Sequence, residues 1–244
     1  MLFNGGKLKY PTEIDGASGT MYRNYYLKYI EIPVTLKMRT NDINGIRYFG
    51  RIGLGTAFKI GSKVEDKFTT LSNGLLTDSK KNPDGTRTDH WKLDQPHSPY
   101  LAMMAVGEFK KVVDAPWNGK EISYYVEKEY ESSATGIFGD TREMIEFYSS
   151  RLGVAYPWPK YAQIAVRDYV SGAMENTSAT LHGDFVVYQT SRELIDGKKG
   201  EDVIAHELFH QWFGDIAICE SWSNLSLNES FATYGEYLWN EYKF

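Results

Sequence analysis

The segment EDVIAHELFHQWFGD, from Glu201 to Asp215, is the most informative part of this 244-residue chain for its fold. Its acidic first residues suit the positive end of a helix dipole and Gly214 suits a helix end, so we expect a helix over about 201–213. Within it, His206 and His210 lie four residues apart. At 3.6 residues per turn, both imidazoles project from nearly the same face and can reach one ion. The segment therefore predicts a helix that presents part of a metal site.

A catalytic zinc site typically keeps three protein ligands and one open position. Glu229 is the best candidate for the third ligand, because the eighteen residues after His210 leave room for a helix end, a connection and a neighbouring helix. Mixed imidazole and carboxylate ligands suit the borderline softness of zinc, so we predict one Zn²⁺ ion held by His206, His210 and Glu229. Glu207 emerges beside the histidines, where it can touch a water on the ion without being a ligand. Glu236, seven residues after Glu229, either orients a ligating histidine or is a solvated helix residue.

The competing interpretation is that the two histidines are merely solvated or packed. Average residue usage produces His-Glu-x-x-His by accident in roughly one chain of this size in a hundred or fewer, which favours the metal site. The remaining histidines, His90, His97 and His182, lack a partner at ligand spacing, and we expect them in core or surface positions. Cys219 is expected to be a packed small residue.

Composition limits the partners of the chain. A net charge of -5 and a pI near 5.6 argue against nucleic acid, because phosphate binding relies on an excess of Lys and Arg. Cys219 is the single cysteine, so no intrachain disulfide can form, which fits a reducing compartment or an exported protein without crosslinks. No signal peptide is visible at residues 1–6, and no stretch approaches the roughly 18 apolar residues of a membrane helix. We expect a soluble chain, cytoplasmic, or exported if the true N-terminus is missing, with the oligomeric state left open.

The pattern of residues divides the chain into two domains. Residues 1–112 are rich in Gly, Tyr, Thr and β-branched residues, with short apolar runs between turn signals, which is a β pattern. Within it, the polar stretch from Thr77 to Asp89 predicts an exposed loop. In residues 113–244, helical signals alternate with short strands. The fold class predicted is therefore α+β.

Individual elements of the second domain follow from local signals. A helix is expected over 141–152, with Asp140 as its cap and Gly153 just beyond its end. Strands are expected over 161–169 and 180–188, and a further helix from near Ser226 towards the end of the chain.

Three motifs in order carry a resemblance to a known family: Gly172-Ala173-Met174-Glu175-Asn176 (GAMEN), His206-Glu207-x-x-His210 followed by Gln211-Trp212-Phe213-Gly214-Asp215, and Asn228-Glu229-Ser230-Phe231-Ala232. Supporting matches are Leu71-Ser72-Asn73-Gly74, Pro99-Tyr100-Leu101, Val106-Gly107-Glu108-Phe109 and Tyr156-Pro157-Trp158-Pro159-Lys160. Over residues 66–244 the chain closely resembles the aminopeptidase N family of zinc metallopeptidases, which belong to the gluzincins.

The resemblance implies the end of a β-sandwich-like N-terminal domain (1–112), followed by a thermolysin-like catalytic domain (113–244). It implies removal of N-terminal residues from peptides with a free N-terminus, with Glu207 as the general base on a zinc-bound water. Glu175 is implied to bind the free α-amine, so that only the first peptide bond lies over the metal. Its neighbours are implied to contact the substrate, Gly172 and Ala173 through their backbones, together with Met174 and Asn176.

The chain also departs from the family. Relatives continue well beyond the third ligand, and a Tyr of that later segment stabilises the oxyanion, whereas this chain stops at Phe244, fifteen residues after Glu229. Tyr234 and Tyr237 lie too close to the ligand helix to replace that Tyr. We therefore expect a truncated chain with an incomplete catalytic domain, whose own activity is open.

Two alternatives follow for the function. The first is a catalytically weak or silent zinc-containing fragment that binds peptide N-termini. The second is a thermolysin-like endopeptidase, which shares the histidine motif and a downstream Glu but is disfavoured by GAMEN. A bifunctional epoxide hydrolase is conceivable, although no residue singles it out.

Overall fold

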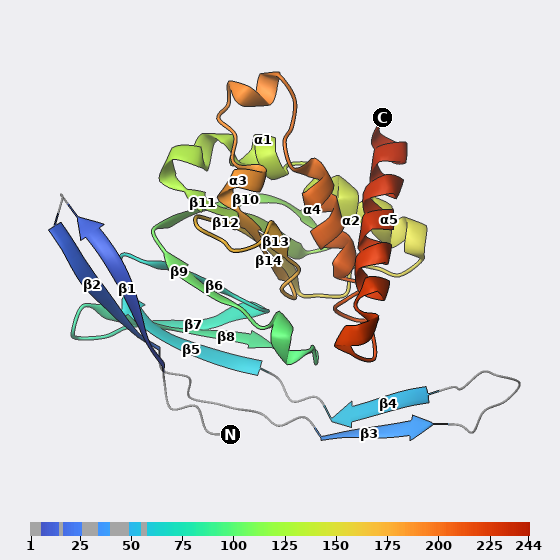
Figure 1. Cartoon of the computed structure of the whole chain (residues 1–244), viewed down its shortest axis with the longest axis horizontal. Helices are drawn as coiled ribbons and strands as arrows, with labels where there is room; N and C mark the ends of the chain where they lie inside the picture. The colour runs from blue at the N-terminus through green and yellow to red at the C-terminus, as the bar shows by residue number, and fades with distance from the viewer. Residues whose placement is uncertain (1–5, 15–16, 26–33, 40–48, 55–57) are drawn as a thin grey trace, which may run out of the picture.

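The structure, a computed structural model, describes residues 6–14, 17–25, 34–39, 49–54 and 58–244 (Figure 1). The strands in this part of the chain are β1 (Gly6–Ile14), β2 (Ala17–Tyr25), β3 (Val34–Arg39), β4 (Phe49–Leu54), β5 (Phe58–Glu65), β6 (Thr69–Ser72), β7 (Leu75–Lys81), β8 (Thr86–Leu93), β9 (Met104–Gly107), β10 (Phe109–Trp117), β11 (Lys120–Glu127), β12 (Lys160–Val166), β13 (Ala173–Met174) and β14 (Ala179–Gly183). The α-helices are α1 (Ala134–Phe138), α2 (Thr141–Leu152), α3 (Asp184–Val187), α4 (Glu201–His210) and α5 (Ser226–Lys243), with short 3-10 turns between them. Helices and strands occur together, which confirms the α+β class.

A five-stranded mixed sheet forms the centre of the fold, in the order β10-β11-β12-β14-β13. Strands β11, β12 and β14 run parallel, while β10 and β13 are antiparallel to their neighbours at the two edges. Parallel strands of this kind are usually covered on both faces. The two residues of β13 lie next to β14, so residues 172–176 are held at the sheet edge.

Alternating side chains of the central sheet fill two separate cores. On one face, Ile122 and Tyr124 of β11 pack with α1, α2, α4 and α5, and on the other face Tyr125 packs with Leu71 of β6 and Trp91 of β8. The period of two along a strand accounts for this division. The central sheet therefore lies between a helical layer and the smaller sheets β5-β8-β7 and β6-β9 (Figure 1).

Helices α4 and α5 lie side by side in the helical layer. Gly235 of α5 faces Phe209 of α4 so closely that a Cβ at residue 235 would lie 2.4 Å from the Phe209 ring. The buried Tyr148 hydroxyl of α2 donates to the Gly235 carbonyl at 2.9 Å. A glycine is thus required for the close approach of the two helices.

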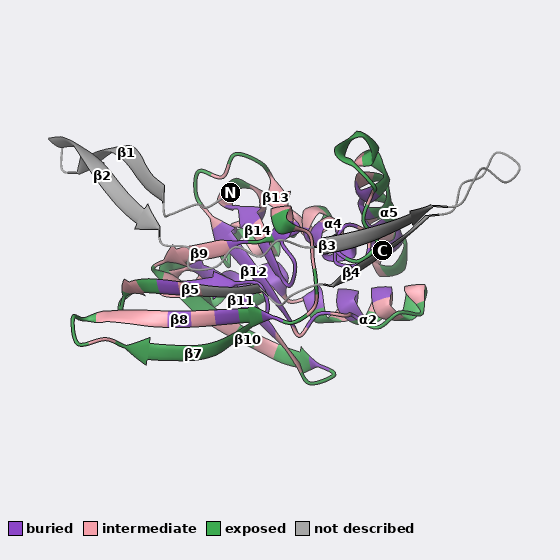
Figure 2. Ribbon diagram, turned by 90° about the horizontal axis from the view of Figure 1, so that it is seen from below, coloured by how far each residue is buried: buried purple, intermediate pink, exposed green. Residues whose placement is uncertain are grey.

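The sequence predicted an exposed loop from Thr77 to Asp89, but this stretch forms most of a β-hairpin. Strands β7 and β8 pair antiparallel, and only residues 82–85 form the turn. Every residue of β7 is exposed, as Figure 2 shows in green, because this strand lies at the edge of its sheet. An edge strand with two solvated faces lacks the apolar alternation by which a strand is recognised.

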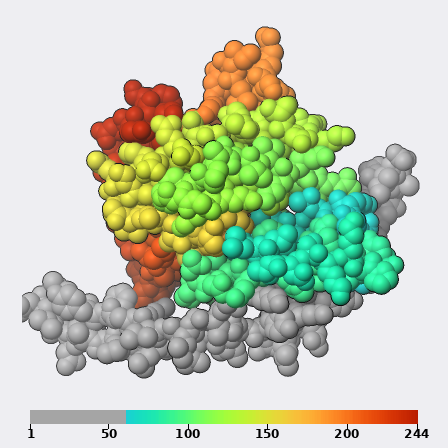
Figure 3. Space-filling model, turned by 180° about the vertical axis from the view of Figure 1, so that it is seen from behind, coloured from blue at the N-terminus to red at the C-terminus, as the bar shows by residue number. Residues whose placement is uncertain are grey.

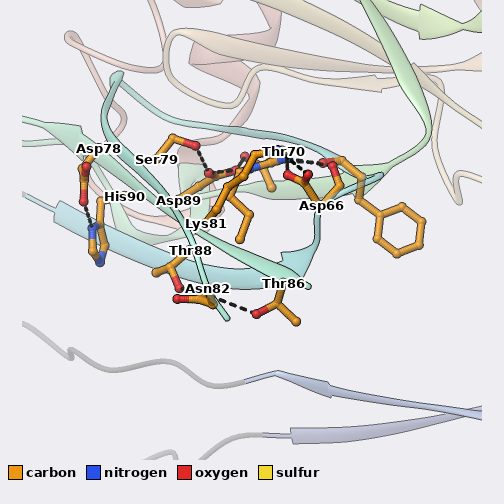
Figure 4. Close-up of polar contacts among 12 residues, drawn as sticks. Asp66, Thr70, Asp78, Ser79, Lys81, Asn82, Thr86, Thr88, Asp89 and His90 are labelled. Carbon is orange, nitrogen blue, oxygen red and sulfur yellow. Dashed lines mark hydrogen bonds and ion pairs between the residues drawn. The ribbon is translucent and has the colours of Figure 1, made fainter. Parts of the chain in front are cut away.

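A buried polar network centred on Asp89 supports this hairpin (Figure 4). The Asp89 carboxylate accepts hydrogen bonds from Thr70 Oγ1 at 2.7 Å and Ser79 Oγ at 2.6 Å, which joins β6, β7 and β8. Arg87 donates to the same carboxylate at 2.8 and 2.9 Å and also to the Phe68 carbonyl at 2.7 Å. A buried charge with this many donors stabilises the fold only as long as all partners remain.

Replacing Asp89 with Asn should therefore destabilise the protein by about 3 kcal/mol, because Arg87 loses its buried counter-ion. Burial alone would raise the pKa of Asp89, but hydrogen bonds from Arg87, Ser79 and Thr70 outweigh it and lower the pKa. A lowered carboxyl pKa contributes stability above the unfolded value, and that contribution is lost as the pH falls through the folded value. Thermal unfolding should therefore show a wild-type advantage near pH 7 that shrinks below about pH 4. The matched change Asp94→Asn, at an exposed pair with Lys92, should cost less than about 1 kcal/mol; equal effects of the two changes would contradict the role of the network.

The elements of the second half were predicted with mixed accuracy. The helix over 141–152 and the one starting at Ser226 are confirmed, and Gly153 has the left-handed conformation expected at a helix end, with φ 66°. Helix α4 stops at His210, three residues earlier than predicted. The strand predicted over 180–188 is wrong beyond Gly183, where the chain turns into α3.

Asp140 does not act as the side-chain cap that the sequence predicted. Its carboxylate instead accepts from Lys198 and, at 3.3 Å, from Lys243, and so ties the segment before α4 and the end of α5 to the start of α2. The segment around residues 190–200, orange in Figure 3, projects from the rest of the surface.

Of the helices in the described part of the chain, none has both the length and the apolar character to cross a bilayer.

Candidate metal and substrate site

Three side chains from α4 and α5 converge on one point. His206 Nε2 lies 3.1 Å from His210 Nε2 and 3.3 Å from Glu229 Oε2, and His210 Nε2 lies 3.5 Å from the same oxygen. The histidines share one face of α4, and the contact of α4 with α5 brings Glu229 of the neighbouring helix opposite them. The structure thus brings together the three residues that the sequence singled out as ligands.

The spacing of these atoms suits a small tetrahedral cation. A zinc ion with bonds of about 2.0–2.1 Å would hold its ligand atoms about 3.3–3.4 Å apart, and the three distances of 3.1, 3.3 and 3.5 Å bracket that value. When both imidazoles are neutral with the proton on Nδ1, the three facing atoms are all acceptors, and they repel unless a proton or a metal ion lies between them. The donor set, two imidazoles and a carboxylate, is one that zinc prefers.

The second ring nitrogen of each histidine has an acceptor beside it. Nδ1 of His206 lies 2.5 Å from Glu236 Oε1, and Nδ1 of His210 lies 2.9 Å from the Phe213 carbonyl oxygen. Each acceptor favours the tautomer that carries its proton on Nδ1. In that tautomer the Nε2 lone pairs are directed at the point where the two imidazoles and Glu229 converge. Of the two interpretations of Glu236, the structure supports contact with the histidine over a merely solvated position.

Charges around the site shift the proton affinities of its members. Burial raises the pKa of Glu207 to about 8, with Glu175, Glu229 and Glu236 adding to this effect and His210 opposing it. Burial alone would lower the pKa of His210, but the hydrogen bond to Glu229 and the charges of Glu175 and Glu207 raise it to about 9. The pKa of Glu229 is lowered, first by its hydrogen bond to His210. The buried Glu207 carboxyl therefore holds a proton more readily than an exposed carboxyl does.

A pocket of about 400 Å³ opens over the three converging residues. Glu207 lines it, and its Oε2 is buried and has no hydrogen-bond partner. The facing wall consists of residues 171–175, so Gly172, Ala173, Met174 and Glu175 border the same space as the histidines. The pocket therefore combines three side chains that could hold a cation, a buried carboxylate oxygen without a hydrogen-bond partner and a second carboxylate next to the sheet edge.

The remaining predicted residues lie elsewhere. Asn176 is buried and does not line the pocket; its amide donates to the Leu101 carbonyl at 3.3 Å. Tyr234 and Tyr237 are exposed on α5. His182 is buried in the core against Gln163, and Cys219 is a free, half-buried thiol.

Sequence reasoning did not single out Gln211 or its contacts. This residue directly follows His210, is fully buried and contacts the loop that carries Glu175. The signal was available only in part, because a glutamine at the end of an apolar helix predicts a buried hydrogen-bonding role but not its partner.

Comparison with known proteins identifies the class. Residues 137–244 match the Peptidase family M1 domain, a span that contains the GAMEN, histidine and Glu229 motifs. The chain belongs to the aminopeptidase N family, whose members are zinc metallopeptidases.

Individual relatives support this assignment. Endoplasmic reticulum aminopeptidase 1 of Mus musculus is 30% identical over 192 residues, which cover 78% of this chain and 21% of that protein. Aminopeptidase N of Mus musculus is 31% identical over 231 residues, or 91% of this chain and 24% of that protein. Glutamyl aminopeptidase of Bos taurus is 35% identical over 174 residues, or 70% of this chain and 18% of that protein. The chain thus spans about a quarter or less of the length of these relatives.

Proposed function

We propose that this chain carries the metal-binding and substrate-binding core of a zinc aminopeptidase, which hydrolyses the N-terminal peptide bond of peptides. The observation that carries the proposal is the shared pocket, which is lined by the three converging residues His206, His210 and Glu229 and also by Glu175 and Glu207. Relatives named as aminopeptidases support the reaction class. In this proposal, residues 1–112 belong to a β-sandwich-like domain and residues 113–244 to a thermolysin-like catalytic domain of the gluzincin type.

His206, His210 and Glu229 would hold one zinc ion. When bound there, zinc supplies Lewis acidity, which polarises the scissile carbonyl and makes a water more acidic. Glu236 and the Phe213 carbonyl hold the two imidazoles in the orientation that directs Nε2 at the ion.

Glu207 moves the proton. Its buried carboxylate takes a proton from the attacking water and later gives it to the departing amine, so one side chain acts as base and then as acid. Burial raises the pKa of Glu207, which favours holding the proton that it takes, while a cation at the neighbouring ligands would favour its release.

Glu175 would select the substrate. Its carboxylate, at the pocket wall formed by residues 171–175, attracts the free α-ammonium of a peptide and so places the first peptide bond over the metal. The backbones of Gly172 and Ala173 hold the peptide extended because small side chains allow close approach. Met174 borders the same cleft. Asn176 holds the loop from behind, through its hydrogen bond to the Leu101 carbonyl.

The test compares a peptide that has a free N-terminus with its N-acetylated form in the zinc-loaded protein. Cleavage of the free peptide alone, abolished by a chelator and restored by zinc, is the expected result. The variant Glu175→Gln should raise KM for the free peptide, because the ammonium loses its ionic partner. Equal cleavage of the blocked peptide would indicate an endopeptidase, and zinc binding without turnover would indicate a silent N-terminus-binding module.

A further inference from the structure

The turn from Glu175 to Ser178 lies between two sets of anchors. On one side, the buried Lys160 ammonium donates to the Ser178 carbonyl at 2.9 Å, and Asn73 Nδ2 donates to the Thr177 carbonyl at 2.8 Å. These bonds attach the turn to β12 and to the segment after β6. These bonds do not connect the turn to α4, the helix that carries His206 and His210.

The side chain of Gln211 makes that connection. Its Nε2 donates to the Glu175 carbonyl at 3.0 Å, and its Oε1 accepts from the Ser178 amide at 2.8 Å. One amide group therefore binds the first and the last residue of the turn. A primary amide suits this task because it offers a donor and an acceptor on adjacent atoms.

Gln211 is itself firmly placed. It has no exposed surface, its backbone N–H bonds to the Leu208 carbonyl at 3.1 Å, and its carbonyl accepts from Trp158 Nε1 at 3.0 Å. Because it is the residue after His210, its side chain links the end of the ligand helix directly to the turn. Ser178 has φ 63°, a conformation that a serine keeps only where its surroundings hold it.

We infer that Gln211 is a positioning residue, which fixes the separation between Glu175 and the metal ligands and thereby determines which bond of a peptide is cut. This inference rests on the proposed function. Catalytic geometry tolerates little displacement, since about 1 Å can cost roughly 10²-fold in rate. The amide of Gln211 therefore contributes to selectivity without touching the substrate.

The test measures how much an amine adds to the affinity of a metal-binding thiol. The probes are 2-amino-4-methylpentane-1-thiol and 4-methylpentane-1-thiol, which differ only in the amine, and their Kd values are measured by calorimetry on the zinc-loaded protein. In Gln211→Met the affinity advantage of the amino thiol should fall about 10-fold or more, while the affinity of the plain thiol should change less than about 2-fold. In Glu175→Gln the advantage should also fall, and adding Gln211→Met should lower it no further.

Gln163→Met is the matched control. Gln163 is also a fully buried glutamine with two side-chain hydrogen bonds, and these join it to Thr141 and His182 rather than to the turn. The Gln163→Met variant should leave the affinity advantage of the amino thiol over the plain thiol unchanged. Gln211→Glu, which keeps the acceptor for Ser178 and loses the donor to Glu175, should give an intermediate loss.

The outcomes separate the inference from the proposed function. If the wild-type protein binds no zinc or shows no amine advantage, the proposed function is wrong. If the wild type shows the advantage and Gln211→Met keeps it, the positioning role is overturned. An equal loss for both thiols in Gln211→Met and Gln211→Glu would also overturn it, because the residue would then support the whole site rather than Glu175.

Discussion

Glu207→Gln should lower kcat by roughly 10²- to 10⁴-fold while the protein retains one equivalent of zinc. Glutamine has nearly the same size and fits the same pocket wall, but its amide cannot accept a proton from water. Zinc should remain because the three converging atoms belong to His206, His210 and Glu229. KM should change little, since the interaction lost is made in the transition state.

Steady-state kinetics on an aminoacyl amide, together with metal analysis of the same sample, check this expectation. Glu143→Gln is a suitable control, because that carboxylate pairs with Lys243 on the helical layer and lies outside the pocket. A Glu207→Gln variant that kept more than about a tenth of the wild-type kcat would show that another group takes the proton.

The second large effect is expected at Glu229. Glu229→Ala should weaken zinc binding by more than the roughly 10–100-fold expected for Glu236→Gln, since a ligand contributes more than the partner of a ligand. The two carboxylates form a matched pair on α5, seven residues apart, and both contact His206, at 3.3 and 2.5 Å. Competition with a chelator of known affinity measures both constants.

A reversed order, with Glu236→Gln the more damaging change, would assign the ligand role to Glu236. Equal and small effects of the two substitutions on zinc affinity would show that α5 supplies no ligand, because neither carboxylate would then contribute to binding the ion.

The sequence predicted the group of candidate metal ligands well, because helical geometry determines how they are arranged. Two histidines four residues apart must share a face of α4, and a Glu at the start of the next helix lies within reach of them. The end of α4 was harder to locate, since Gln211, Trp212 and Phe213 are compatible with a helix and their N–H groups still bond three or four residues back. The side chains of Gln211 and Trp212 bond instead to the distant carbonyls of Glu175 and Val154.

Features decided by distant residues were not predictable in this way. Strand β7 is a polar edge strand that is recognisable only beside β8, and Asp140 binds two lysines that are far away in sequence. The partners of Gln211 lie 33 and 36 residues earlier in the chain. Local periodicity carries no information about contacts of this range.

The contact of Gly235 with Phe209 has a consequence for the ion. Gly235 lies six residues after Glu229 on the same helix, so the close approach of the Phe209 ring to this glycine helps to set the distance of α5 from the helix that carries the histidines. No covalent link joins the two helices at this point. A change in the fit of this apolar ring against bare backbone should therefore reach Glu229 through the helix that carries both residues.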